Sequence, residues 1–100
     1  MSSSKNQRNK NEALKSVSIQ FTAHGWDDYC HWEAMDREIL RHIKLLIQAC
    51  LRDPFKGIGK PKALVGDLKG LWSRRITHKD RLVYSYTGGV LTILQCRDHY

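Results

Sequence analysis

The chain has 100 residues, of which 41% are hydrophobic, and a formal net charge of +7 at pH 7. A chain of this length forms one small domain and leaves no room for a second. The positive charge favours an anionic partner, so nucleic acid, an acidic protein and an anionic membrane surface all remain open. No apolar run approaches the ~20 residues that a membrane-spanning helix needs, and the N-terminus lacks the apolar core of a secretory signal.

Two compositional features bear on the class of protein. Residues 1–16 are polar with almost nothing to bury, which is typical of a disordered basic lead or an expression remnant, so residues 17–100 are expected to fold. The three cysteines form no CxxC pair. We interpret them as small core residues of a cytoplasmic protein that has no disulfide framework and no metal site or cofactor.

The first elements are expected to be a strand and a helix. The alternation of apolar and polar residues over 17–22 predicts a half-buried strand. Thr22 or His24 is expected to cap the helix that follows. Asp27 and Asp28 would then lie in its first turn, where the helix dipole favours carboxylates.

A second helix is expected to follow directly. Asp36 is its predicted cap, the apolar residues after it recur at helical spacing, and the Asp53-Pro54 pair should end it because proline disfavours helix in the residue before it. After a loop over 54–63, three further strands are expected at about 70–77, 80–87 and 90–97.

The order of these elements indicates an α+β domain. A Gly88-Gly89 turn should join the last two strands in a hairpin. Two helices would then pack on one face of a twisted, mostly antiparallel, four-stranded sheet.

Positive charge is concentrated between Arg52 and Arg81, where nine cations stand against three carboxylates. This stretch is either a solvated basic face or a surface that binds nucleic acid. Arg74 and Arg75 are adjacent on a predicted strand, so their side chains point to opposite faces and at most one of them can support a concave site. The candidate nucleic-acid-binding residues are Lys60, Lys62, Lys69, Arg74 and Arg75.

The chain ends in Arg97-Asp98-His99-Tyr100, directly after an apolar run that predicts a buried strand. That strand would bring a cation, an imidazole and a phenol to one point at the rim of the sheet. An imidazole beside several guanidinium groups suits chemistry on a phosphodiester.

Several short motifs follow one another along the chain. They are Trp26-Asp27-Asp28-Tyr29, Asp53-Pro54-Phe55, Gly57-Ile58-Gly59-Lys60-Pro61, Gly70-Leu71-Trp72-Ser73-Arg74-Arg75-Ile76, Arg81-Leu82-Val83-Tyr84 and His99-Tyr100. Together they resemble the YoeB/Txe family, the RelE-type mRNA interferase toxins of bacterial toxin–antitoxin modules. The resemblance covers about residues 17–100.

The resemblance implies a microbial-RNase-like fold and a metal-independent endoribonuclease that cleaves mRNA on the ribosome. It implies His99 as general acid, Arg81 as the residue that stabilises the phosphate, and Tyr100 as the residue that orients the substrate. Arg75 matches a further basic position. The implied partners are an acidic antitoxin, the ribosome and mRNA, and operator DNA through the antitoxin complex, and a homodimer is left open.

The chain departs from the family at Lys62, because family members usually carry a glutamate there as general base. Lys62 could act as the base only if Arg75 and Arg81 made it release its proton near neutral pH; a phosphate contact is the favoured interpretation. A family member that mainly binds the ribosome, the antitoxin and operator DNA is therefore an alternative, and a basic RNA-binding domain unrelated to toxins ranks last.

Overall fold

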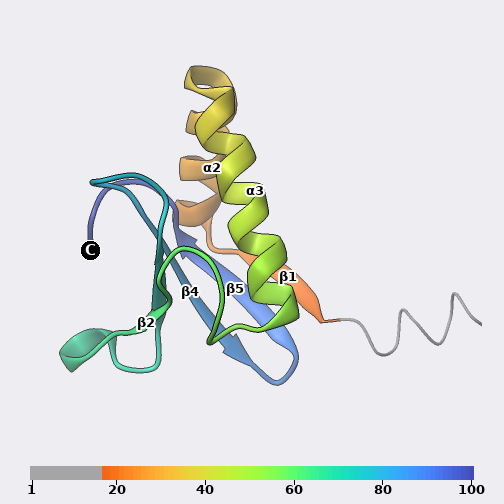
Figure 1. The fold of residues 1–100 in the computed structure, drawn as a ribbon, viewed down its shortest axis with the longest axis vertical. Coiled ribbons are helices and arrows are strands. Elements are labelled where there is room, and N and C mark those ends of the chain that lie inside the picture. Colours follow the sequence, from red (N-terminus) through yellow and green to blue (C-terminus); the bar gives the residue numbers. More distant parts are fainter. Residues whose placement is uncertain (1–16) are drawn as a thin grey trace, which may run out of the picture.

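The computed structural model describes residues 17–100, so the expectation for residues 1–16 lies outside the described residues. Two helices pack on one face of a five-stranded sheet whose strand order is β1-β5-β4-β3-β2 (Figure 1). The elements in chain order are β1 (Ser18–Phe21), α2 (Ala23–Met35), α3 (Arg37–Arg52), β2 (Lys62–Ala63), the 3₁₀ helix η1 (Gly66–Leu68), β3 (Trp72–Arg75), β4 (Arg81–Thr87) and β5 (Val90–Gln95).

The sheet confirms the predicted fold class and adds one strand. β1 pairs with β5 in parallel, and the other neighbouring strands pair antiparallel. The additional strand is β2, which has only two residues and places Lys62 opposite Ser73 on β3. A strand this short shows no alternation in the sequence, so its pairing with β3 is what defines it.

The helix caps agree with the sequence, and the start of α2 corrects one expectation. The Thr22 hydroxyl accepts a hydrogen bond from the Gly25 amide at 3.0 Å, so Thr22 and not His24 is the cap. Because α2 already begins at Ala23, Asp27 and Asp28 both lie beyond the first turn, and Asp28 is buried. Its carboxylate therefore has another role than complementing the helix dipole.

The second helix begins and ends as its sequence predicts. Asp36 accepts hydrogen bonds from the amides of Glu38 and Ile39 at 3.1 and 3.2 Å, as an N-cap residue should. The helix ends at Arg52, directly before the Asp53-Pro54 pair. None of the helices within residues 17–100 is long and apolar enough to cross a membrane.

The core lies between the helices and one face of the sheet. Ile43 and Leu46 of α3 pack there with Tyr84 of β4 and Ile93 of β5, all fully buried. A side chain at Gly25 would place its Cβ 2.4 Å from the Ile93 carbonyl oxygen, so this glycine allows α2 to lie directly on β5. The last residues of β5 are thereby held against α2.

The cysteines occupy the positions expected of unpaired residues. Cys50 and Cys96 are buried in the core cluster and Cys30 is half-buried, and all three are free thiols. Within residues 17–100 no group of His, Cys, Asp and Glu side chains could hold a metal ion.

Candidate active site

A basic hollow of about 460 Å³ lies on the face of the sheet that the helices leave open. It receives side chains from the loop after α3, from β2, β3 and β4, and from the C-terminal tail. Its lining residues are Lys60, Lys62, Ser73, Arg75, Arg81, His99 and Tyr100. We call it the basic hollow.

Strand register explains why these side chains meet. Lys62 pairs with Ser73 across β2 and β3, and Arg75 pairs with Arg81 across β3 and β4. Residues two apart on a strand share a face, and so do directly opposed residues, so all four point the same way. No Asp or Glu is among the described residues that line the hollow, and its lysine and arginine side chains favour an anionic ligand.

The Arg81 side chain is fixed on one side by backbone carbonyls of the turn before β4. Its Nη1 donates to the carbonyl oxygens of Thr77, Asp80 and His78 at 2.9, 3.1 and 3.3 Å. Within the described chain its other guanidinium nitrogens make no hydrogen bond and remain available to an anion. An arginine held in this way can bind phosphate without first being ordered.

The tail brings its last two side chains into the hollow together. Asp98 has a φ of 64°, a left-handed conformation, and the chain bends there before His99. The His99 and Tyr100 rings lie 4.5 Å apart between centroids, and the Tyr100 hydroxyl is 3.5 Å from the Ser73 hydroxyl. Both terminal side chains are exposed and can reach a ligand in the hollow.

Arg74, a candidate for nucleic-acid binding, lies outside the basic hollow and is fully buried on the helix-covered face. Its guanidinium donates to the carbonyl oxygens of Asp53, Lys56 and Ile58 at 2.6, 3.0 and 3.0 Å. Its Nε also donates to the Tyr84 hydroxyl at 3.1 Å. Arg74 therefore has no group to offer to RNA and instead ties the loop after α3 to the sheet.

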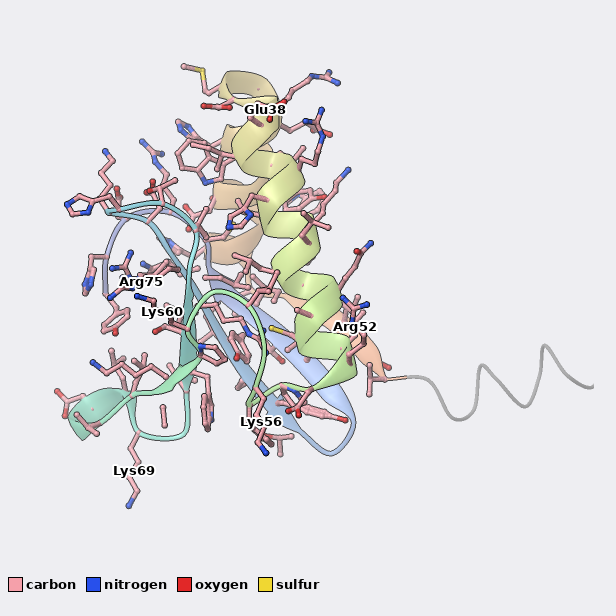
Figure 2. All side chains as sticks on the ribbon, in the orientation of Figure 1. Glu38, Arg52, Lys56, Lys60, Lys69 and Arg75 are labelled. Carbon is pink, nitrogen blue, oxygen red and sulfur yellow. The ribbon has the colours of Figure 1, made fainter. Side chains whose placement is uncertain are left out.

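Lys69 also lies away from the hollow. It is exposed after η1 and points away from the sheet, whereas Lys60 and Arg75 lie near the C-terminus (Figure 2). Asp67 is the carboxylate nearest to Lys62 in the sequence. It is exposed on η1 and does not line the hollow. The structure thus brings together Lys60, Lys62, Arg75, Arg81, His99 and Tyr100, and leaves Lys69 and Arg74 outside.

Comparison with known families places the chain among bacterial toxins. A family model described as the YoeB-like toxin of bacterial type II toxin–antitoxin systems matches residues 21–100. The chain belongs to this family.

Similar YoeB proteins cover the same part of the chain. The toxin YoeB of Streptomyces coelicolor is 55% identical over 84% of this chain and all of its own length. A YoeB/ParE toxin structure from Agrobacterium tumefaciens is 43% identical with a TM-score of 0.81, and covers 84% of this chain and all of its own. Two Staphylococcus aureus structures, a YoeB dimer and a heterotetrameric YoeB-YefM complex, are each 34% identical over 84% of this chain and 98% of theirs, with TM-scores of 0.79 and 0.78.

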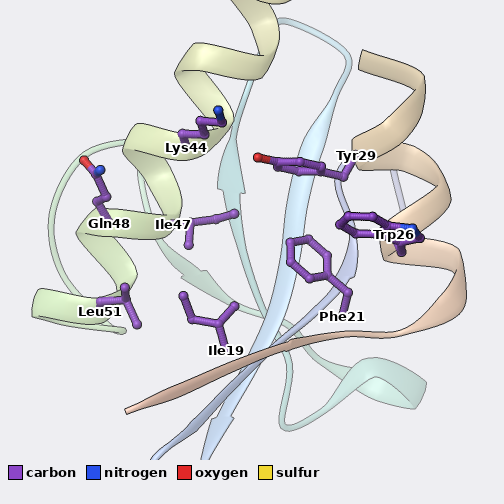
Figure 3. Close-up of a pocket in the computed structure, with 8 residues that line it drawn as sticks. All are labelled: Ile19, Phe21, Trp26, Tyr29, Lys44, Ile47, Gln48 and Leu51. Atoms are coloured by element: carbon purple, nitrogen blue, oxygen red, sulfur yellow. The ribbon is translucent and has the colours of Figure 1, made fainter. Parts of the chain in front are cut away.

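This YoeB-like toxin has a second, apolar hollow of about 540 Å³ on the helix side (Figure 3). Its walls come from β1, α2 and α3, and the Trp26 and Tyr29 rings stack there at 5.7 Å between centroids. Lys44 is the one charged side chain among the described residues that line it. The larger hollow therefore lacks the groups that act on a phosphodiester.

Ser73 is a lining residue that sequence reasoning missed. A serine on a strand carries no signal of its own in the sequence. Only its position, opposite Lys62 and two residues before Arg75, places it in the toxin's basic hollow. Knowing the pairing of β2 with β3 would have been enough to find it.

Proposed function

We propose that this YoeB-like toxin is a metal-independent endoribonuclease that cleaves mRNA on the ribosome and thereby inhibits translation. The observation that carries the proposal is the convergence of His99 and Tyr100 with Arg75 and Arg81 in one basic hollow. An imidazole can carry a proton at neutral pH, and guanidinium groups can bind the charged phosphate of a transition state. The family resemblance points to the same reaction.

The reaction uses the ribose of the RNA itself. The 2′-hydroxyl loses its proton to water, its oxygen attacks the phosphorus, and the bond from phosphorus to the 5′-oxygen breaks, which leaves a 2′,3′-cyclic phosphate. The need for a 2′-hydroxyl restricts cleavage to RNA. His99 gives its proton to the departing 5′-oxygen, and Arg81 and Arg75 stabilise the negative phosphorane. Tyr100, beside the His99 ring, orients the substrate.

Lys62 takes the role of a phosphate contact in this proposal. It lines the hollow from β2 at the family's glutamate position, and among the described lining residues there is no Asp or Glu side chain to replace that glutamate. This observation favours a second candidate function, a catalytically weakened toxin that mainly binds the ribosome and its antitoxin. Loss of a general base costs about 10²–10⁴-fold in rate.

The proposed partner is a cognate acidic antitoxin that masks the cationic face and binds operator DNA together with the toxin. The Staphylococcus aureus YoeB-YefM complex supports an antitoxin partner, and the YoeB dimer from the same organism supports a homodimer. The toxin would act in the cytoplasm, where translating ribosomes are found.

The test is cleavage of a defined mRNA on purified ribosomes by wild type, His99→Ala and Lys62→Glu. We expect wild type to cleave and His99→Ala to lose about 10²-fold or more of the rate. Equal cleavage by His99→Ala would contradict the mechanism. A weak wild type with a strong gain in Lys62→Glu would favour the second candidate, and strong wild-type cleavage with no gain would exclude it.

A further inference from the structure

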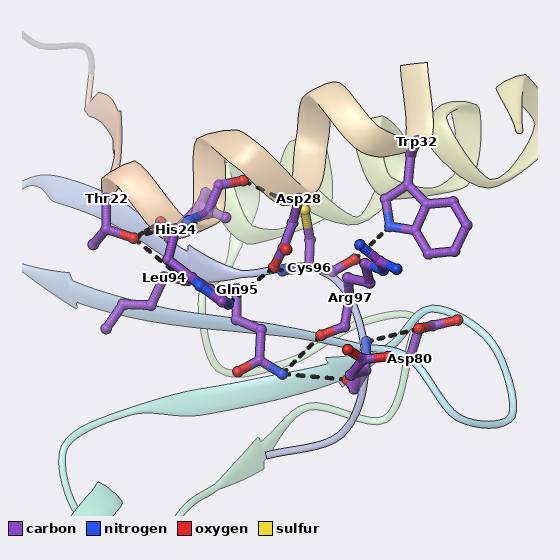
Figure 4. Close-up of polar contacts among 12 residues, drawn as sticks. Thr22, His24, Asp28, Trp32, Asp80, Leu94, Gln95, Cys96 and Arg97 are labelled. Atoms are coloured by element: carbon purple, nitrogen blue, oxygen red, sulfur yellow. Dashed lines mark hydrogen bonds and ion pairs between the residues drawn. The ribbon is translucent and has the colours of Figure 1, made fainter. Parts of the chain in front are cut away.

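The tail that carries His99 and Tyr100 lies beyond the end of β5 at Gln95. Its backbone groups therefore have no strand ladder to satisfy them and must find other partners. Figure 4 shows that these partners are side chains from α2 and from the turn before β4, together with the Gln95 side chain at the end of β5, which donates to the carbonyl oxygens of Arg97 and Asp98.

The first anchor comes from one face of α2. The Cys96 amide donates to the Asp28 carboxylate at 3.1 Å, and the Trp32 indole donates to the Cys96 carbonyl oxygen at 2.7 Å. Asp28 and Trp32 are four residues apart, so they lie one turn apart on the same face of the helix. Both backbone groups of Cys96 are thereby held by α2.

The second anchor is Asp80, in the turn before β4. Its Oδ1 accepts from the Asp98 amide at 2.7 Å, and its Oδ2 accepts from the Thr77 hydroxyl at 2.7 Å. The Arg81 amide donates to the Asp98 carbonyl oxygen at 3.0 Å. Both backbone groups of Asp98 are therefore held by the segment that positions Arg81.

The burial of these carboxylates needs a reason. Asp28 is 7% and Asp80 is 2% exposed. His24 Nε2 lies 3.4 Å from Asp28 Oδ2, and no lysine or arginine within residues 17–100 forms a salt bridge with either carboxylate. A buried carboxylate is costly unless hydrogen bonds compensate it, and the tail amides supply those bonds. Burial raises the pKa of the Cys96 thiol to about 12, and the nearby Asp28 and Asp80 carboxylates add to the rise.

We propose that Asp28 and Asp80 are positioning residues that hold alternate amides of the tail, Cys96 and Asp98, and so place His99 and Tyr100 in the basic hollow. The catalytic consequence rests on the proposed function, whereas the anchoring concerns the chain alone. Asp28 belongs to the Trp26-Asp27-Asp28-Tyr29 motif but takes no part in the cleavage chemistry. The proposal gives it a role, which is to position the tail.

Amide hydrogen exchange followed by NMR tests the anchoring without any substrate. In the wild-type chain we expect the Cys96 and Asp98 amides to be protected and the Arg97 amide between them to exchange faster. Asp80→Ala should remove protection at Asp98 and leave Cys96 protected, and Asp28→Ala should do the reverse. Asp80→Asn retains an acceptor oxygen and should retain protection at Asp98.

Ribosomal mRNA cleavage by the same variants tests the catalytic consequence. Asp80→Ala should lower kcat by about 10²-fold with KM little changed, because a displaced catalytic group costs rate more than binding. Asp80→Asn should recover most of that loss. Asp27→Ala and Asp67→Ala remove exposed carboxylates of equal charge and should behave as wild type.

Each outcome decides a separate point. Fast exchange of both Cys96 and Asp98 in wild type, or undiminished protection at Asp98 in Asp80→Ala, overturns the anchoring. Lost protection with unchanged kcat overturns the positioning role. A wild-type chain that protects both amides but does not cleave RNA contradicts the proposed function and leaves the anchoring supported. If the alanine variants do not fold, the wild-type exchange pattern and the Asp80→Asn variant carry the test.

Discussion

The two faces of β3 give adjacent arginines opposite surroundings. Arg74 points toward the helices, is fully buried, and uses its guanidinium on three backbone carbonyls and the Tyr84 hydroxyl. Arg75, the next residue, points into the basic hollow and is exposed. One residue type therefore stabilises the fold on one face and can bind an anion on the other.

The comparison shows that the covered face supports the open one. Arg74 and the Arg75 amide both hold the loop that carries Lys60, the latter by donating to the Gly59 carbonyl oxygen at 2.7 Å. A Cβ at Gly59 would lie 2.8 Å from Leu46 Cδ2, and φ is 83°, so any other residue there would have to adopt a left-handed backbone and displace the Leu46 side chain. Contacts on the helix-covered side of the sheet therefore hold the loop that places Lys60 at the hollow.

The largest expected effect is on stability, at Arg74. Arg74→Ala leaves three loop carbonyls and Tyr84 without their charged donor, so we expect the free energy of unfolding to fall by about 3–5 kcal/mol. Arg75→Ala is the matched control and should change it by less than about 0.5 kcal/mol. Urea denaturation of both variants measures the difference. Equal losses would show that the two faces do not differ in this way.

Arg75, whose loss should hardly affect stability, should matter for the rate of catalysis. Arg75→Ala should lower the rate of mRNA cleavage about 10²-fold, as is typical when one donor to a charged transition state is removed. Arg75→Lys keeps the charge without the forked geometry and should recover part of the rate. Single-turnover cleavage on ribosomes measures both. A fully active Arg75→Ala variant would remove Arg75 from the proposed site.

The covered face should also respond to alkaline pH. Burial raises the pKa of Tyr84 to about 12 from its ordinary value near 10, although the hydrogen bond from Arg74 opposes the rise. The fold therefore favours the neutral phenol, and this contribution is complete below pH ~10 and is lost as pH rises through about 12.

Urea denaturation at several pH values checks this dependence. The free energy of unfolding of wild type should fall between about pH 10 and 12, and the curve for Tyr84→Phe should be flatter over that interval. Parallel curves for the two proteins would show that Tyr84 does not contribute to the loss.

The smallest expected effect concerns the salt dependence of RNA binding. Lys60 lines the basic hollow and Lys69 does not. Lys60→Ala should reduce the slope of log affinity against log salt for single-stranded RNA by about 0.7, the value for one lost phosphate contact. Lys69→Ala has the same charge change and should leave the slope unaltered. Equal effects would indicate a diffuse basic surface.

Local patterns in the sequence determined most of the elements and their order. Alternating residues predicted the strand β1, although it is more exposed than the expected half-buried strand, with Ile19 45% exposed. Asp36 and Asp53-Pro54 predicted the limits of α3, and Gly88-Gly89 predicted the hairpin, because caps and turns depend on residues close in the chain. The sequence also showed that only one of Arg74 and Arg75 could face a concave site. The roles assigned to His99, Arg81 and Lys62 stay predictions.

Only the tertiary structure decided that Arg75 is the arginine that faces the hollow. It also decided which residues hold the C-terminal tail in place. The pairing of β2 with β3 brings Lys62 to Ser73, and the packing of α2 on β5 brings Asp28 to Cys96, across 68 positions of the chain. Contacts at such separation leave no periodic signal, because they depend on how whole elements pack and not on neighbouring residues. Composition, caps and turns were therefore readable from the sequence, whereas the basic hollow and its anchors required the fold.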